Sequence, residues 1–68
     1  MLKISLEAAR VNARLSQKEA AKILKISHCT LSNWEKGKTY PPADKISMLC
    51  ELYNISYDAI NFLPSNSL

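Results

Sequence analysis

The chain has 68 residues, with nine basic and six acidic side chains and a formal net charge of +3. That length suffices for one domain near the lower size limit for a single hydrophobic core, and it excludes a nucleotide-binding fold with a separate catalytic cleft. The charge is uneven, because residues 1–40 hold eight basic and three acidic residues, whereas residues 41–68 hold one basic and three acidic residues. This asymmetry is expected of a protein that faces a polyanion with one side; a solvated basic surface is the alternative.

Strand-like alternation is absent, and a single glycine interrupts the sequence, so we predict an all-α domain of five helices. Ser5 is the expected N-cap of a first helix over about 6–13. Ser16 and Glu19 have the spacing of a capping box, in which the hydroxyl accepts from the amide of Glu19 and the carboxylate accepts from the amide of Ser16. The second helix should then cover about 17–24.

The third expected helix is capped by Ser27 and ends near Lys36, before a left-handed stop at Gly37. At about 100° per residue, Leu31 and Trp34 fall on one side of this helix and should lie in the core. The opposite side carries short polar side chains and no acid: His28, Cys29, Ser32 and Asn33. Such a face suits the major groove of DNA, about 12 Å wide. An ordinary solvated helix face is the alternative.

The polar face has a chemistry suited to base edges. Asn33 can pair bidentately with the N6/N7 edge of adenine, and His28 can donate to a guanine or accept from an amino group. Cys29 is better suited to packing on a thymine methyl group, and Ser32 is adaptable. These four residues are the candidate base contacts.

Four further residues are candidates for phosphate contacts. Lys36 and Lys38, at the end of the third helix and beyond it, are better placed for phosphates than for bases. Gln17 lies in the first turn of the second helix, where free amides and the positive end of the helix dipole favour a phosphate. A surface glutamine is the alternative there. Tyr40 is a further candidate.

Pro42 suits the first turn of a fourth helix, whose apolar residues have the spacing of a core-facing stripe. That stripe comprises Ala43, Ile46, Leu49, Cys50 and Tyr53. Ser56 is the expected cap of a short fifth helix over 57–60. The domain should therefore cover residues 1–63, with a loosely ordered tail over 64–68.

Cys29 and Cys50 have no motif spacing, and with His28 they do not form a usual zinc site. We expect reduced thiols, no metal and no cofactor; a disulfide is the alternative. No segment approaches the roughly 20 apolar residues that span a bilayer, and the N-terminus has no apolar signal region. We therefore expect a cytoplasmic protein.

A resemblance to a known family depends on residues that occur in this order along the chain: Arg10, Leu15-Ser16-Gln17, Ala21, Ile26-Ser27, Leu31, Trp34, Glu35-Lys36-Gly37-Lys38, Pro41 and Ile55-Ser56. With these positions, residues 6–60 resemble the lambda-repressor-like (Cro-type) helix-turn-helix family. The resemblance implies a compact five-helix fold, operator DNA as the ligand, and base contacts from the four polar residues of the third helix. It also implies phosphate contacts from Gln17 and Ser27, and an ion pair between Arg10 and Glu35.

Two positions depart from the family pattern. Lys25 stands at the corner that the family usually fills with glycine, so it is either left-handed, with about 1–2 kcal/mol of strain, or the turn has another shape. Ala20 replaces a larger apolar residue, and Trp34 is expected to fill the space.

The resulting hypothesis is a transcriptional regulator, a repressor encoded by a bacterium, phage or mobile element, that binds its operator as a homodimer on half-sites about 34 Å apart. Tyr57, Phe62 and Leu63 are the candidate dimer surface, because they are too apolar for the outside of a small monomer. Alternatively, Phe62 and Leu63 fold back onto the core. No membrane interaction or small-molecule effector is expected.

Three other functions compete with this hypothesis. The main alternative is a protein-interaction module, such as an antitoxin or accessory regulator, that binds a protein partner. A thiol-based redox regulator would depend on Cys29 in the polar face. A small enzyme is excluded by content, since the chain has one histidine, no paired acids in register and no phosphate loop.

Overall fold

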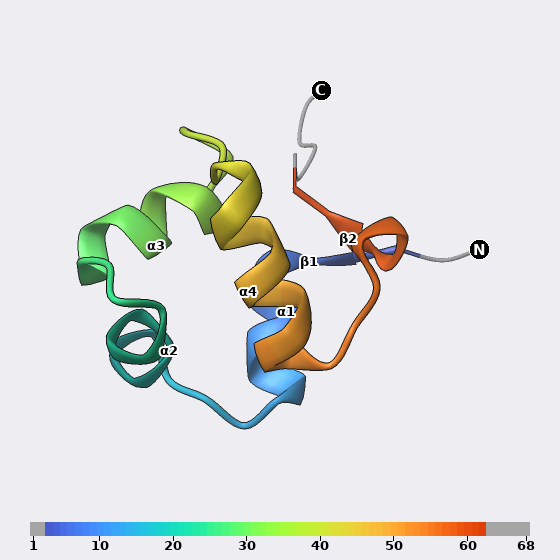
Figure 1. Cartoon of the computed structure of the whole chain (residues 1–68), viewed down its shortest axis with the longest axis horizontal. Helices are drawn as coiled ribbons and strands as arrows, with labels where there is room; N and C mark the ends of the chain where they lie inside the picture. The colour runs from blue at the N-terminus through green and yellow to red at the C-terminus, as the bar shows by residue number, and fades with distance from the viewer. Residues whose placement is uncertain (1–2, 63–68) are drawn as a thin grey trace.

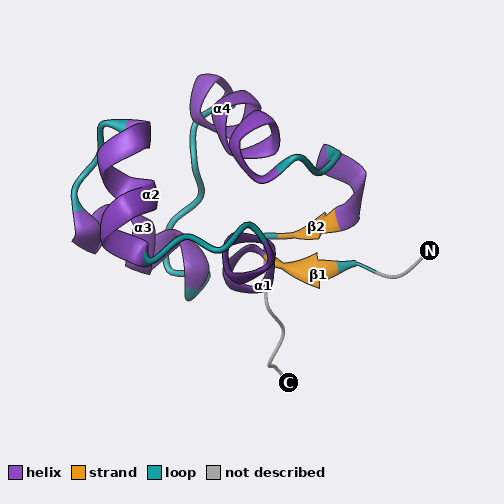
Figure 2. Ribbon diagram, turned by 90° about the horizontal axis from the view of Figure 1, so that it is seen from below, coloured by secondary structure: helices purple, strands orange, loops and turns teal. Residues whose placement is uncertain are grey.

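Four α-helices, a short 3₁₀ helix and a small parallel sheet make up residues 3–62, the part of the chain that the computed structural model describes. Their order is β1 (Ile4–Ser5), α1 (Leu6–Asn12), α2 (Gln17–Leu24), α3 (His28–Glu35), α4 (Ala43–Tyr53), the 3₁₀ helix η1 (Tyr57–Ala59) and β2 (Ile60–Asn61). Figures 1 and 2 show α2 and α3 on one side of the molecule and the strands on the other, with α1 and α4 between them. Leu63 and the predicted tail over 64–68 lie outside the described residues.

Serine caps begin the first three helices, as predicted. The Ser5 hydroxyl accepts a hydrogen bond from the amide three residues on, at 3.0 Å, and Ser27 does the same at the start of α3. At the start of α2 the complete capping box is present: Glu19 N–H donates to Ser16 Oγ (3.0 Å), and Ser16 N–H donates to Glu19 Oε1 (2.9 Å). The bond from the Ser16 amide lowers the pKa of the Glu19 carboxyl. The predicted boundaries of these helices are confirmed to within one residue.

One hydrophobic core joins all four helices to β2. Its buried residues are Leu6, Ala9, Ala20, Ala21, Leu24, Leu31, Trp34, Leu49, Tyr53, Ile60 and Phe62. Ile26 is half-buried against this core at the corner between α2 and α3. In the stripe predicted for α4, Ala43 is exposed, and Pro42 is the N-cap residue, one position before the first turn.

The short fifth helix predicted over 57–60 is a 3₁₀ helix rather than an α-helix, so residues 3–62 hold four α-helices and not five. The segment forms η1, and Ile60 begins β2, which pairs in parallel with β1 so that Ile4 lies opposite Ile60. Ser56 occupies the N-cap position of η1 but makes no side-chain capping bond. The all-α prediction missed the sheet because each strand has two residues and the pairing joins distant parts of the chain. Local alternation of apolar and polar residues cannot reveal such a pair.

The turn between α2 and α3 depends on a left-handed lysine. Lys25 has φ 60° and ψ 43°, the conformation that glycine adopts without steric cost. Ile26 N–H then donates to the carbonyl of Ala21 at 3.0 Å, which closes the end of α2. From α4, Lys45 Nζ donates to the carbonyl of Leu24 at 2.8 Å and so satisfies a second carbonyl of the same helix end. The structure therefore shows the left-handed alternative for Lys25.

Lys25→Gly is expected to stabilise the fold by about 0.5–1 kcal/mol, because the relieved strain of about 1–2 kcal/mol exceeds the entropy cost of glycine, about 0.5–1 kcal/mol. Thermal unfolding followed by circular dichroism measures the effect as a higher Tm. Lys22→Gly is the matched control, since it removes the same charge from an exposed position inside α2. That variant should lose about 1 kcal/mol. Equal losses in both variants would contradict the assignment of strain to Lys25.

Candidate nucleic-acid interface

Helix α3 has two faces that differ in burial as well as in polarity. Leu31, Trp34 and Glu35 are buried against the rest of the domain. On the other face His28 and Cys29 are exposed, and Ser32 and Asn33 are half-buried. The structure therefore brings the four candidate base contacts together on the outer side of a helix whose inner side is anchored in the core.

The ends of α3 carry the candidates for phosphate contacts. Ser27 is exposed. Its Oγ accepts a hydrogen bond from the Thr30 amide and also lies 2.8 Å from the Thr30 hydroxyl. Beyond the other end Lys36 and Lys38 are exposed, on either side of Gly37, which has φ 76°. These positive side chains flank the polar face without neutralising carboxylates of their own, since neither lysine has an ion pair within the described residues.

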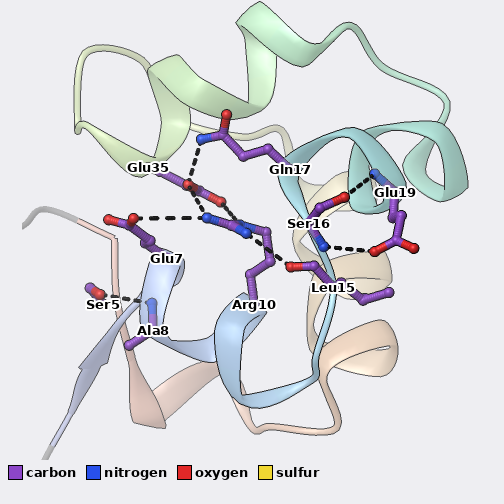
Figure 3. Close-up of polar contacts among 9 residues, drawn as sticks. All are labelled: Ser5, Glu7, Ala8, Arg10, Leu15, Ser16, Gln17, Glu19 and Glu35. Atoms are coloured by element: carbon purple, nitrogen blue, oxygen red, sulfur yellow. Dashed lines mark hydrogen bonds and ion pairs between the residues drawn. The ribbon is translucent and has the colours of Figure 1, made fainter.

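Gln17, the remaining phosphate candidate near α3, belongs to a cluster of hydrogen bonds around a buried ion pair (Figure 3). Arg10 and Glu35 are only 8% and 7% exposed, and Arg10 Nε donates to Glu35 Oε2 at 2.7 Å. Arg10 Nη2 lies 3.4 Å from Glu35 Oε1, and Gln17 Nε2 donates to the same oxygen at 2.8 Å. Arg10 Nη1 donates to the carbonyl of Leu15 at 2.9 Å. One guanidinium thus ties α1 to α3 and to the loop that leads into α2.

The hydrogen bond from Arg10 to Glu35 also raises the pKa of the guanidinium above its ordinary value. Glu7 contributes a weaker contact, at 3.8 Å from Arg10 Nη2. The resemblance implied the pairing of Arg10 with Glu35, whereas the bond from Gln17 was not anticipated. No local signal exists for it, because Gln17 and Glu35 are 18 residues apart.

Next to the ion pair, the hydroxyl of Tyr53 is buried and has no hydrogen-bond partner. Burial raises the pKa of this phenol to about 12, and the nearby Glu35 carboxylate adds to the shift. As the pH rises, the unfolded chain releases this proton first. The contribution of Tyr53 to stability is therefore fully present below about pH 10 and is lost between about pH 10 and 12.

Tyr53→Phe should remove that pH dependence and cost little at pH 7, since it deletes an unpaired buried hydroxyl. We expect the stability difference between variant and wild type to be constant from pH 7 to 9. At pH 11 it should move in favour of the variant by about 1 kcal/mol, given about 1.4 kcal/mol per pH unit. Urea unfolding at the three pH values measures it. Tyr40 and Tyr57 are common to both proteins and cancel; a difference that stays the same at pH 11 would contradict the burial effect.

Tyr40 belongs to an aromatic cluster at the other end of the domain. The ring centroid of Tyr40 lies 5.4 Å from that of Phe62, and the ring centroid of Tyr57 lies 5.6 Å from that of Phe62. The two hydroxyls are 3.0 Å apart, a hydrogen bond that raises the pKa of Tyr40. Phe62 is buried, so it folds back onto the core and does not offer an open dimer surface. Tyr57, 51% exposed, is the dimer candidate whose side chain lies at the surface among residues 3–62.

Two further observations concern the chemistry of the site. Cys29 and Cys50 are free thiols rather than a disulfide, and burial raises the pKa of Cys50. Within residues 3–62 no three histidine, cysteine or acidic side chains gather as a metal site would require. No helix in this described part is long and apolar enough to cross a membrane.

Comparisons with known proteins identify a family model and two relatives that match this chain. A helix-turn-helix family model matches residues 6–60, which is most of the chain. The HTH-type transcriptional regulator ImmR of Bacillus subtilis (strain 168) is 43% identical over 53 residues, covering 78% of this chain and 42% of ImmR. The HTH-type transcriptional activator BcrR of Enterococcus faecalis is 27% identical over 55 residues, covering 81% of this chain and 27% of BcrR. The chain thus spans less than half the length of these relatives. No solved structure gives a significant match.

Proposed function

Because the chain belongs to the lambda-repressor-like helix-turn-helix family of DNA-binding transcriptional regulators, we propose that it reads a specific operator by inserting α3 into the major groove. The observation that carries this proposal is the division of α3: Leu31 and Trp34 anchor it in the core, and short polar side chains cover its outer face. The family is one of transcription regulators rather than enzymes.

The proposed contacts follow from the positions of the side chains. His28, Cys29, Ser32 and Asn33 meet base edges, and Asn33 supplies the bidentate contact to an adenine. Phosphate contacts flank them at both ends of α3 and at the start of α2. These come from Gln17, Ser27, Lys36 and Lys38; Tyr40, in the connector between α3 and α4, is proposed as a further phosphate contact.

Assembly and regulation are the finer parts of the proposal. One domain covers few base pairs, so we expect a homodimer on the operator, with Tyr57 at its interface and half-sites about 34 Å apart. The proposed mode of regulation is repression, in which the bound domain blocks polymerase from the DNA that it covers. The protein would then act in the cytoplasm, where its DNA lies.

The proposal is tested by selecting binding sites from random duplex DNA with wild type and Asn33→Ala in parallel. We expect wild type to recover a two-fold symmetric motif. The variant should lose preference at one base pair of each half-site, at a cost of about 1–3 kcal/mol in discrimination. Weak binding without a motif, which simply fades as salt rises, would contradict operator reading. It would favour the protein-interaction module, with a protein as partner.

A further inference from the structure

The amide of Gln17 is held in the free protein by a buried carboxylate. Glu35 is 7% exposed, and its Oε1 accepts from Gln17 Nε2 at 2.8 Å. A carboxylate only accepts hydrogen bonds, so the nitrogen end of the glutamine amide must face it and the oxygen end must face away. Figure 3 shows this orientation, with the nitrogen of Gln17 toward Glu35.

The carboxylate that holds Gln17 is in turn held by Arg10. Arg10 donates through Nε to Glu35 Oε2 and through Nη1 to the carbonyl of Leu15, two residues before Gln17. The same cation therefore sets the position of the acceptor and of the backbone from which the glutamine extends. The backbone from which the Gln17 side chain extends and the acceptor of its amide are therefore both held in place before any ligand binds.

This arrangement leaves one donor available outside the cluster. An amide NH₂ group has two hydrogens, and no acceptor within residues 3–62 takes the second hydrogen of Gln17. Gln17 is also the first residue of α2, whose first-turn amides and dipole attract an anion. A half-buried side chain that is already ordered loses less conformational entropy when it binds than a freely rotating one.

We infer that Glu35, besides stabilising the fold, is a positioning residue for DNA binding: its carboxylate orients the Gln17 amide so that the second N–H can donate to a backbone phosphate. This inference rests on the proposed function. It differs from a purely structural role for Glu35 because the effect must pass through Gln17.

The change in DNA affinity caused by Glu35→Gln tests the inference, because electrostatics alone and the positioning role predict changes in opposite directions. Glu35→Gln removes a negative charge, which by itself strengthens binding to a polyanion. If Glu35 positions Gln17, the same substitution weakens binding, since a neutral amide can face Gln17 with either end and no longer selects one orientation. Glu51→Gln is the matched control, with the same chemical change at an exposed site on α4.

The experiment is a double-mutant cycle of wild type, Gln17→Ala, Glu35→Gln and the double variant, with the Glu51→Gln control. Affinity for a fluorescein-labelled duplex of mixed sequence is measured by anisotropy at low salt, under conditions where circular dichroism shows each protein folded. Glu35→Gln should weaken binding about two- to tenfold in the wild-type background and have no weakening effect once Gln17 is alanine. Glu51→Gln should leave affinity unchanged or slightly higher.

A weakening by Glu35→Gln that persists in the Gln17→Ala background would overturn the inference while leaving the proposed function intact. A wild-type chain that binds no duplex would instead remove the proposed function, and the inference with it. If Glu35→Gln does not fold, the inference is tested on the wild-type protein by NMR of the Gln17 side chain. Gln17 is the only glutamine of the chain, so ¹⁵N-glutamine labelling isolates its side-chain signal.

That signal reports whether the amide is ordered in the free protein. We expect a side-chain order parameter above about 0.6, together with weaker DNA binding by Gln17→Ala. The exposed Asn12 amide at the end of α1, labelled in a second sample, provides the comparison for a solvent-exposed group. An order parameter for Gln17 below about 0.6, or equal to that of Asn12, would overturn the inference.

Discussion

Glu35→Ala is expected to lower the free energy of unfolding by about 3–5 kcal/mol, a large part of the total stability of so small a domain. The substitution leaves the buried Arg10 guanidinium without the carboxylate that it contacts at 2.7 Å, and it removes the acceptor of the Gln17 amide. The cost is that of an uncompensated buried charge rather than the net value of the ion pair. Urea unfolding at pH 7 measures it.

Glu7→Ala is the control for that prediction. Glu7 contacts the same guanidinium at 3.8 Å, but its side chain is 64% exposed. Because water screens such a pair, the loss should be below about 1 kcal/mol. Both substitutions remove one negative charge from the neighbourhood of Arg10. Equal losses in the two variants would show that burial does not set the strength of the cluster.

Leu31→Ala is expected to cost about 2–5 kcal/mol, because the Leu31 side chain is fully buried and its truncation leaves a cavity under α3. Cys29→Ala, in the first turn of the same helix but exposed, should change stability by no more than about 0.5 kcal/mol. Chemical unfolding of both variants compares the two faces of α3 directly. A loss for Cys29→Ala as large as that for Leu31→Ala would mean that the polar face is not open to a ligand.

Local signals in the sequence predicted the helix ends well. A cap acts over three residues, so Ser5, Ser27 and the Ser16–Glu19 box could be recognised from spacing alone. The left-handed Gly37 was predicted for the same reason. Two other left-handed residues, Arg14 and Asn54, were not predicted, since no glycine marks them.

The features that were missed depend on contacts between distant residues. Ile4 pairs with Ile60 in the small sheet, and Lys45 caps the end of α2 from another helix. Neither has a pattern within a single element. The buried position of Phe62 was one of two alternatives that composition could not separate, because an apolar residue near a chain end suits a core or an interface equally.

For the candidate site, helical periodicity was sufficient to group the four polar residues on one face of α3, because periodicity is a property of one helix. The fixed orientation of Gln17 required the structure. It arises from a carboxylate 18 residues away that is brought close only when α2 and α3 pack together.

The central claim is that α3 reads DNA, and it is tested most directly by titrating ¹⁵N-labelled protein with the duplex recovered from the selection. Chemical shifts should change most in α3, at His28 to Asn33, and at the start of α2 near Gln17. The amides of β1 and β2, on the opposite side of the molecule, should change least (Figure 1). Changes concentrated in the strands or η1, with α3 unaffected, would contradict the claim.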